Sequence, residues 1–596
     1  MKKEDIARRV AALRRLMKEK QLDAFVFPST DPHHGEYVPD HWKGREWISG
    51  FDGSAGTAVV TMEKAALWTD SRYFIAAADQ LKDTEFALMR ERVEGTPSVA
   101  EWIGKNLGGQ ANARVGLDGM VNSASEVSSL TSQLQEYGSF DVVTSVDPLE
   151  TIWEDRPSIP KGKVVVHPLE FAGEPAREKI GRIRECIAGQ RADAILVSSL
   201  DDIAWTLNMR GSDVHCNPVF VSYLLITDED AMLFIDEEKL TDQELAYLHQ
   251  EGVSTAPYEM TSEVLSELSG GTIILDPDLV NHTLYHSVSC EVMPVASPIP
   301  AMKAVKNETE IRGFHQAMLR DGVAMVKFLK WLEEAVAEGQ ESELSVGEKL
   351  LAFRTEQPMF KGLSFDTIAG YQAHGAIVHY EATEASNAML RPEGLLLLDS
   401  GGQYLDGTTD ITRTIALGPL SEEEKRVYTL VLKGHLRLQA LKFPDGASGT
   451  QLDAVARQPL WEEGLNFLHG TGHGVGCYLN VHEGPHQIRM EWKPASLRSG
   501  MTVTDEPGIY VEGAFGVRIE NTLLVTPYKE TRFGRFLQFE PLTLCPIDLR
   551  PVDAALLNTE EKSWLNAYHR TVCERLTPYL TPDEAAWLEK ATSPLS

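Results

Sequence analysis

The sequence predicts a mixed α/β protein in which a duplicated α/β domain precedes a C-terminal part of the α+β type. The first observation is a repeat, because residues 7–30 and 177–200 share apolar, arginine and aspartate positions. Two copies are too few for a solenoid and indicate a duplicated domain. The second observation is a change after residue 300, where a long helical pattern precedes short strands separated by glycine-rich turns.

The composition of the 596-residue chain is typical of globular proteins, with 43% hydrophobic and 24% charged residues. This balance excludes wholesale disorder, and the length predicts about three or four domains. Acidic residues number 88 against 56 Lys and Arg, giving a net charge of −32. Such a surface repels phosphate backbones, so we expect no nucleic-acid partner. No run approaches the roughly 18 apolar residues of a membrane helix, so we expect no membrane partner.

The N-terminus is predicted to be an amphipathic surface helix, because Ile6, Val10, Leu13 and Met17 recur every three or four residues. It lacks the apolar core of a signal peptide. The six cysteines are scattered and include no CxxC pair. They therefore predict free thiols in a reducing compartment, and a cytoplasmic location.

Each copy of the repeat is predicted to run from an amphipathic helix through a buried strand and a tryptophan segment to a strand ending in aspartate. The three later segments are 25–27, 45–53 and 65–70 in the first copy, and 195–197, 203–211 and 231–236 in the second. Proline-rich stretches at 157–160 and 294–300 follow the two copies, and are predicted linkers.

The two copies differ after the shared aspartate. The first continues with Ser71-Arg72-Tyr73, whereas the second has Glu237-Glu238-Lys239, so Arg72 has no basic counterpart at its repeat position. Arg72 is either a surface charge or a contact for an anionic group such as a peptide carboxylate, which the guanidinium fork suits.

The C-terminal part begins with a predicted helix. Asn307 and Glu310 form a capping pattern, and apolar residues recur behind them as far as Leu332. Short strands follow from about 363 to 526, where histidines and acids concentrate, and the tail from about 545 to 596 is predicted to be helical.

Five segments in this region carry an acid or a histidine at or near a predicted strand. Glycines 401, 402 and 407 permit a hairpin that places the first two acids on neighbouring strands. Strand alternation places Arg518 and the last acid on one face. The five residues are Asp399 in GLLLLDSGG, Asp410 in DGTTDITRT, His473 in HGTGHGVG, Glu506 in TDEPGIY and Glu520 in VRIENTLLV.

Four carboxylates and one imidazole suggest a metal site. Carboxylates gathered at the ends of apolar strands repel one another unless cations neutralise them. This ligand set suits two hard or borderline divalent ions such as Mn²⁺ better than a structural zinc. Paired metals about 3.5–4 Å apart lower the pKa of a shared water and polarise a carbonyl. Taken singly, each residue is better explained as a turn acid, a loop acid or a structural histidine, but the ordered combination of the five is not.

The ordered set of these strings resembles the metallopeptidases with the pita-bread fold, which include methionine aminopeptidase, prolidase and Xaa-Pro aminopeptidase. Further strings resemble the large, three-domain cytosolic Xaa-Pro aminopeptidases (aminopeptidase P), and the resemblance spans essentially the whole chain. These strings are SGFDGSAGTAVVT (49–61), LWTDSRYF (67–74), GLSFDTIAG (362–370), GAIVHY (375–380) and LNVHEGPH (479–486). The resemblance implies creatinase-like domains at 1–158 and 159–302, and a pita-bread catalytic domain at 303–596 with a C-terminal extension from about 534.

The resemblance also implies the roles of the site residues. The five residues Asp399, Asp410, His473, Glu506 and Glu520 are the expected ligands of two divalent metal ions, with Mn²⁺ as the expected metal. Asp410 and Glu520 are the expected bridging carboxylates. The expected nucleophile is a water between the metals, whose proton Glu506 accepts.

Further roles follow from the same resemblance. His379 and His482 are expected to act with Glu506 in catalysis, by hydrogen-bonding the substrate carbonyl and the tetrahedral intermediate. His469 is expected to shape the pocket for proline, and Arg518 to hold carboxylates in place. Arg72 is expected to contact the downstream end of the substrate, within one subunit or across a dimer. The expected substrate-binding residues are Arg72, His379, His469, His482 and Arg518.

The expected reaction is release of the N-terminal residue from peptides with proline at the second position. An Xaa-Pro bond lacks an N–H and needs an apolar slot for its ring. Prolidase, which cuts Xaa-Pro dipeptides, shares the ligands and is the nearest alternative. A non-catalytic pita-bread binding module is a second alternative, although such branches have lost metal ligands. A homodimer is expected from the resemblance alone.

Overall fold

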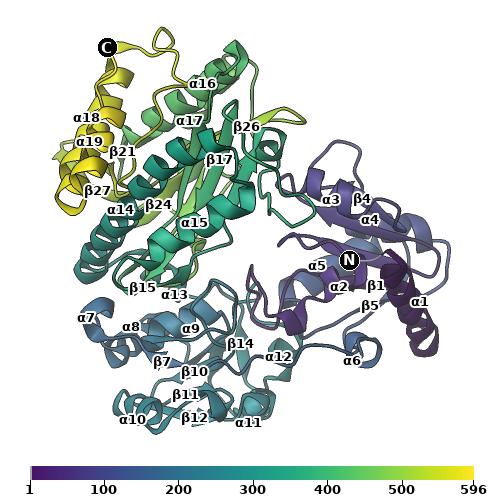
Figure 1. The fold of residues 1–596 in the computed structure, drawn as a ribbon. Helices are drawn as coiled ribbons and strands as arrows, with labels where there is room; N and C mark the ends of the chain where they lie inside the picture. Colours follow the sequence, from purple (N-terminus) through teal and green to yellow (C-terminus); the bar gives the residue numbers. More distant parts are fainter. Residues whose placement is uncertain (1–2) are drawn as a thin grey trace. The chain divides into compact units, whose positions relative to one another are not determined.

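The computed structural model describes residues 3–596, which divide into two compact units (Figure 1). The first unit contains the chain up to residue 167 and residues 174–299, and the second contains 168–173 and 300–596. Within residues 3–596, no helix has both the length and the apolar character of a membrane span.

The first unit contains two six-stranded mixed sheets with the same strand order and the same pattern of parallel and antiparallel neighbours. This identity of topology supports the duplication predicted from the repeat. The first sheet runs β4 (Phe86–Arg90), β3 (Ala65–Thr69), β2 (Thr57–Thr61), β1 (Ala24–Phe27), β5 (Ala113–Leu117), β6 (Phe140–Val143). The second runs β12 (Val253–Ala256), β11 (Ala231–Phe234), β10 (Tyr223–Thr227), β8 (Ala194–Val197), β13 (Thr272–Ile274), β14 (Glu291–Met293).

Helices cover both faces of the first sheet. Successive residues of a strand point to opposite faces, so each face has its own core. Phe25 and Phe27 of β1 pack with helix α1 (Lys3–Lys20), whereas Ala24 and Val26 belong to a separate core with α4 (Val99–Leu107) and α5 (Ala124–Gln135). The predicted apolar stripe of α1 is buried. The remaining helices of this unit are α2 (Gly44–Ser49), α3 (Phe74–Gln80), α6 (Leu149–Ile152), α8 (Ala176–Gly189), α9 (Leu200–Leu207), α10 (Asp242–Gln250), α11 (Thr261–Glu267) and α12 (His282–Ser287).

Polar anchors are also repeated between the two copies. Arg14 of α1 and Arg184 of α8 each donate from Nε to the carbonyl of the last residue of β2 or β10, at 2.9 and 2.8 Å. Asp23 and Asp193 each accept a backbone N–H from β5 or β13, both at 2.8 Å. Arginine and aspartate therefore fix the helix and the central strand in the same way in each copy.

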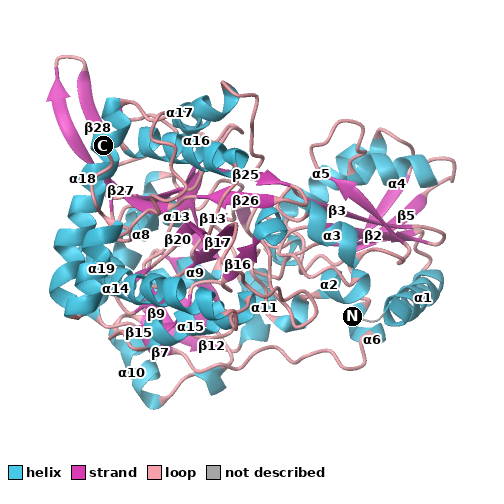
Figure 2. Ribbon diagram, turned by 45° about the horizontal axis from the view of Figure 1, so that its top comes forward, coloured by secondary structure: helices cyan, strands magenta, loops and turns pink. Residues whose placement is uncertain are grey.

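The second unit surrounds short strands with long helices. Helix α14 (Glu308–Glu338) begins at the predicted capping box of Asn307 and Glu310 and packs against α15 (Glu343–Thr355). Figure 2 shows these two helices on one side of the strands, with α16 (Glu422–Gln439) and α17 (Gly449–Trp461) on the other. The prediction of strands from 363 to 526 did not include α16 and α17.

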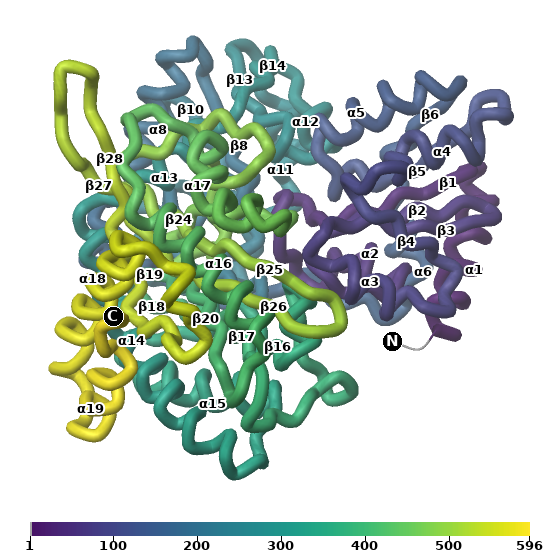
Figure 3. Tube along the Cα trace, turned by 90° about the horizontal axis from the view of Figure 1, so that it is seen from above, coloured from purple at the N-terminus to yellow at the C-terminus, as the bar shows by residue number. Residues whose placement is uncertain are grey.

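The strands of the second unit form small sheets whose ends converge on the candidate site. Strand β17 (Leu395–Ser400) lies between β16 (Ile368–Tyr371) and β20 (Ile411–Ala416). A second sheet runs β21 (Lys442–Pro444), β28 (Gly534–Pro541), β27 (Asn521–Thr531), β24 (Thr502–Asp505), and its β27–β28 hairpin projects from the unit (Figures 2 and 3). Smaller groups are β15 (Phe360–Leu363) with β18 (Gly402–Tyr404) and β19 (Gly407–Thr408), β22 (Gly472–Gly474) with β23 (Glu483–Ile488), and β25 (Gly508–Val511) with β26 (Phe515–Arg518).

The tail is helical, as predicted, with α18 (Thr559–Leu576) and α19 (Pro582–Ala591). The units divide after residue 299, inside the predicted linker 294–300. The other predicted linker, 157–160, has no regular structure and lies within the first unit. The boundaries 1–158, 159–302 and 303–596 stay predictions.

Candidate metal centre

The five predicted ligands lie at or beside strand ends of the second unit. Asp399 is the penultimate residue of β17, and Asp410 directly precedes β20. His473 is the middle residue of β22, Glu506 directly follows β24, and Glu520 lies between β26 and β27. Each side chain is therefore presented by backbone that a sheet holds in place.

The hairpin between the first two acids exists as the glycines predicted. Strands β17 and β20 pair antiparallel, with Asp399 opposite Thr412, and the intervening β18 and β19 form a smaller hairpin. Period-two alternation puts Asp410 and Thr412 on one face of this strand. The pairing thus directs both acids to the same region.

The structure brings donor atoms of several predicted ligands together. Asp410, His473 and Glu520 each offer a donor atom, and these atoms all lie within 4.8 Å of one another. Nε2 of His473 lies 3.4 Å from Oδ2 of Asp410 and 3.6 Å from Oε1 of Glu506. Residues from four separate segments of the second unit thus share one site.

Arg518 joins Asp399 to this cluster. Its Nη2 and Nε donate to Oδ2 of Asp399 at 2.7 and 3.1 Å, and Nε also lies 3.2 Å from Oγ1 of Thr412. That threonine hydroxyl donates to Oε2 of Glu520 at 2.8 Å. The buried Arg518 is thus bonded to Asp399 and, through Thr412, is linked to Glu520.

Among residues 3–596, four carboxylates of the cluster face only two cationic side chains, Arg518 and His473. Burial is the main cause that raises the pKa of Asp399, Glu506 and Glu520, and the pKa of Glu506 reaches about 7. Repulsion among neighbouring carboxylates adds to it. Burial lowers the pKa of His473, but the hydrogen bond with Asp410 and the charge of Glu506 outweigh it and raise that pKa to about 9.

The residues fit divalent cations. Oδ1 of Asp399 is buried and has no hydrogen-bond partner within the described residues, although the other oxygen of the same carboxylate is bonded to Arg518. A buried carboxylate oxygen without a donor is costly unless a cation meets it. Oxygen donors with one imidazole and no thiolate match hard or borderline divalent ions.

Two predicted histidines are connected to the cluster, one by direct contact and one through other side chains. The rings of His482 and His473 are in edge-to-face contact, with centroids 4.3 Å apart. His469 lies on the far side of Tyr510, whose hydroxyl is 2.8 Å from Nε2 of His469 and accepts from Nη1 of Arg518 at 2.7 Å. His469 is therefore linked to Asp399 through a tyrosine and an arginine.

His379 and Arg72 are placed differently. His379 lies in the loop between β16 and β17, and the carbonyl of the preceding Val378 accepts from Nη2 of Arg518 at 3.2 Å. Arg72 belongs to the first unit, where it bonds to Asp70 at 2.8 Å and Glu36 at 3.3 Å. Its predicted contact with a substrate stays a prediction.

Sequence reasoning missed Thr412 and Tyr510. Thr412 lies two positions after Asp410, so strand alternation was an available signal for it. Tyr510 ends the quoted segment TDEPGIY, but nothing in that string shows that its hydroxyl meets both His469 and Arg518.

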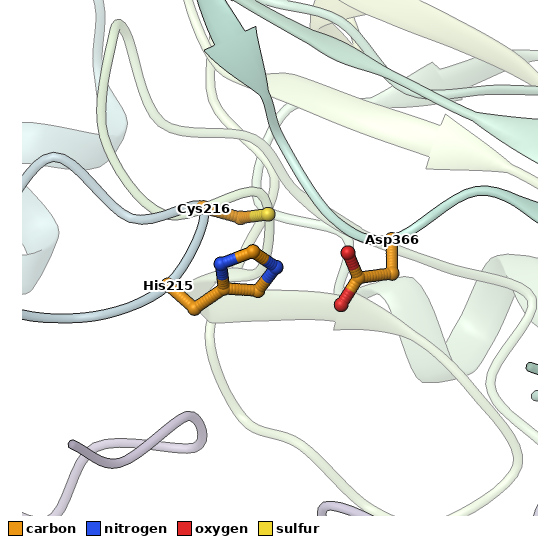
Figure 4. A group of neighbouring side chains, drawn as sticks. All are labelled: His215, Cys216 and Asp366. Carbon is orange, nitrogen blue, oxygen red and sulfur yellow. The ribbon is translucent and has the colours of Figure 1, made fainter. Parts of the chain in front are cut away.

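Three further residues with ligand-type side chains were not predicted. Figure 4 labels His215 and Cys216, neighbours in a loop of the first unit, and Asp366, which belongs to the second unit. Because these side chains belong to different units, they do not define a metal site of either one.

Comparisons with protein families cover most of the chain. The Creatinase/Prolidase N-terminal domain matches twice, at residues 9–152 and 155–310. Metallopeptidase family M24 matches residues 312–527, and the C-terminal region of peptidase M24 matches 535–595.

Named relatives and solved structures agree with these families. "Probable Xaa-Pro aminopeptidase P" of Laccaria bicolor is 44% identical, over 98% of this chain and 93% of the relative. "Xaa-Pro aminopeptidase 1" of Dictyostelium discoideum is 40% identical, over 100% and 97%. The X-prolyl aminopeptidase of Caenorhabditis elegans, described as a cytosolic enzyme with a di-nuclear active site, superposes with a TM-score of 0.94 at 34% identity, over 99% and 100%. The Xaa-Pro dipeptidase of Bacillus anthracis, at 26% identity and a TM-score of 0.51, covers 63% of this chain and 99% of its own.

Proposed function

This chain belongs to metallopeptidase family M24, in its branch of Xaa-Pro aminopeptidases with creatinase-type N-terminal domains, and we propose which of its side chains hold the metals. The cofactors are two divalent metal ions. The proposed ligands are Asp399, Asp410, His473, Glu506 and Glu520, and the proposed metal is Mn²⁺.

The enzyme releases the N-terminal residue from peptides with proline at the second position. The observation that best supports the proposed ligands is the convergence of donor atoms of Asp410, His473 and Glu520 within 4.8 Å. When bound, two divalent ions lower the pKa of a water shared between them and polarise the carbonyl of the scissile bond.

We propose that Glu506 accepts the proton of the attacking water. Its Oε1 lies 3.6 Å from Nε2 of His473, and this position beside another proposed ligand supports the role. The neighbouring hydroxyl of Thr504 lies 3.4 Å from Oε1 of Glu506 and limits its orientation.

His482 and His379 are the proposed donors to the substrate carbonyl and the tetrahedral intermediate. Contact of the His482 ring with His473 supports the first role, because it places a second imidazole beside a proposed ligand. The bond from Arg518 to the carbonyl of Val378 supports the second, because it fixes the backbone next to His379. His469 is proposed to shape the proline pocket, and Arg72 to contact the downstream end of the substrate.

The prolidase alternative is less consistent with how much of this chain each relative matches. The Bacillus dipeptidase matches 63% of this chain, whereas the named aminopeptidases match 98% or more of it. The alternative of a non-catalytic binding module does not agree with a family of metallopeptidases. We also propose a cytoplasmic location, in line with the Caenorhabditis enzyme that is described as cytosolic. A homodimer is proposed from the family resemblance alone.

The test is an assay of an Xaa-Pro-Yaa tripeptide beside the matching Xaa-Pro dipeptide, with and without chelator. We expect cleavage of the tripeptide after its first residue, loss of activity with chelator and restoration by Mn²⁺. Preferential cleavage of the dipeptide would support prolidase instead, and full activity of metal-free protein would contradict the proposed chemistry.

A further inference from the structure

Arg413 of β20 lies between Thr412 and Thr414, so its side chain leaves the strand on the face opposite the metal centre. The side chain is only 1% exposed. Its Nη1 donates to the carbonyl oxygen of Glu520 at 2.6 Å and to that of Thr412 at 2.9 Å. Arg413 therefore fixes the main chain of a proposed bridging ligand and of the threonine that orients its carboxylate.

The same guanidinium also bonds to the C-terminal region and, through Nη2, to Oδ1 of Asn521 at 2.8 Å. Nε donates to the carbonyl of Pro546 at 3.0 Å. Nη2 lies 2.9 Å from the carbonyl of Cys545 and 3.0 Å from the hydroxyl of Tyr568. Pro546, Cys545 and Tyr568 lie within 535–595, the stretch that matches the C-terminal region of peptidase M24. One buried side chain thus joins the ligand strands to the C-terminal extension.

Tyr568 is buried on α18, where its hydroxyl accepts a hydrogen bond from Arg413. Its hydroxyl lies 2.9 Å from the carbonyl of Thr543 and 3.0 Å from that of Cys545, so it donates within the extension. Helix α18 is itself held against α16, because Lys433 and Arg437 bond to the buried Glu561 at 3.0 and 2.8 Å. Helix α18 is therefore a firm support for the hydroxyl.

We propose that the C-terminal extension supports the metal centre, with Arg413 and Tyr568 as positioning residues that fix the main chain at Glu520. This inference rests on the proposed ligand set. Partners outside the ligand shell set the orientation of the ligands, and their loss typically lowers metal affinity about 10- to 100-fold. Tyr568→Phe removes one hydroxyl while keeping the ring, so we expect metal affinity to fall by the lower end of this range, about tenfold.

The test compares Tyr568→Phe with Tyr428→Phe in the full chain. Tyr428 is a matched control, because it is also buried and donates to a carbonyl of the same region, that of Asp548 at 2.8 Å. Co²⁺, which such ligands also accept, serves as the probe. Affinity is measured by calorimetry, ligand geometry by the visible absorption of the Co²⁺ protein, and stability by the Tm of the metal-free protein.

We expect Tyr568→Phe to bind Co²⁺ about tenfold more weakly, with an altered absorption spectrum and a lower kcat at similar KM. Tyr428→Phe should keep the affinity and the spectrum, even if both variants lose Tm. Unchanged affinity and spectrum in Tyr568→Phe, or equal losses in both variants, would overturn the inference.

Arg413→Lys provides a second variant, since one ammonium cannot reproduce a planar fork that reaches four segments. We expect a larger loss of Co²⁺ affinity than in Tyr568→Phe, provided near-ultraviolet dichroism shows a native fold. A failure of the proposed function would look different. In that case wild-type protein would bind no Co²⁺, or Asp410→Ala would bind it as tightly as wild type. If wild type binds Co²⁺ through Asp410 and Tyr568→Phe binds it equally well, only this inference fails.

Discussion

Replacing Arg518 with lysine keeps a positive charge beside Asp399 and removes the planar fork. The native side chain is 1% exposed and bonds to Asp399, Tyr510, Thr412 and the carbonyl of Val378. The lysine side chain is shorter and ends in a single ammonium. It can keep the contact with Asp399, but it loses the hydrogen bonds to the hydroxyl of Tyr510 and to the carbonyl of Val378.

The size of the effect follows from these two bonds. At about 1.5 kcal/mol each, the lower end for bonds that involve a charged group, their loss costs about 3 kcal/mol. Because about 1.4 kcal/mol is a factor of ten, kcat/KM should fall by roughly 100-fold or more. The fall arises because His469 and the backbone beside His379 lose the group that fixes them.

The assay measures kcat/KM on an Xaa-Pro-Yaa tripeptide with metal in excess. Arg354→Lys is the matched control, because Arg354 is a fully buried arginine with a two-point bond to Asp321, at 2.8 and 3.1 Å. It should lower Tm and leave kcat/KM nearly unchanged. If Arg518→Lys keeps activity within about twofold of wild type, or if the control loses as much, the assigned role of Arg518 is wrong.

Three further predictions concern charge. Lys306→Met leaves the buried Glu483 without its ammonium partner, so we expect a loss of about 3–5 kcal/mol in the free energy of unfolding. Denaturant titration measures this loss. The double variant Lys306→Met/Glu483→Gln should recover part of it, and no recovery would contradict the prediction. The hydrogen bond with Glu343 raises the pKa of His374, so their contribution to stability is present below the ordinary value of 6.5 and is lost as pH rises through the raised pKa. His374→Ala should therefore destabilise more at about pH 5.5 than at about pH 9, and equal effects in denaturant titrations at both would contradict this. Because the pKa is raised to about 7 for Glu506 and to about 9 for His473, binding of Mn²⁺ near neutral pH should release protons, and its affinity should rise with pH. Calorimetry in buffers of different ionisation enthalpy measures this release, and heats that do not depend on the buffer would refute it.

Much of the architecture could be predicted because local patterns determine it. Ile6, Val10, Leu13 and Met17 recur with the helical period, and all four are buried on α1. The capping pair of Asn307 and Glu310 likewise marks the start of α14. The duplicated domain was recognisable because both copies keep the arginine and the aspartate that anchor helix to sheet.

The support of the site could not be predicted, because it depends on contacts between distant segments. Arg413 and Tyr568 are 155 positions apart, and nothing local to either residue indicates the other. Arg518 was expected to hold carboxylates, but the sequence does not show that its remaining donors meet Tyr510 and Val378. Patterns in sequence thus single out the candidate acids and histidines, whereas the side chains that bond to them are brought there by tertiary packing.

The most direct test of the account is the metal content of the purified chain, measured by elemental analysis beside that of Asp410→Ala. The account predicts two divalent ions per active wild-type chain, and loss of both metal and activity in the variant, whose fold is checked by dichroism. A fully active wild-type chain without bound metal, or an Asp410→Ala chain that keeps both ions, would contradict it.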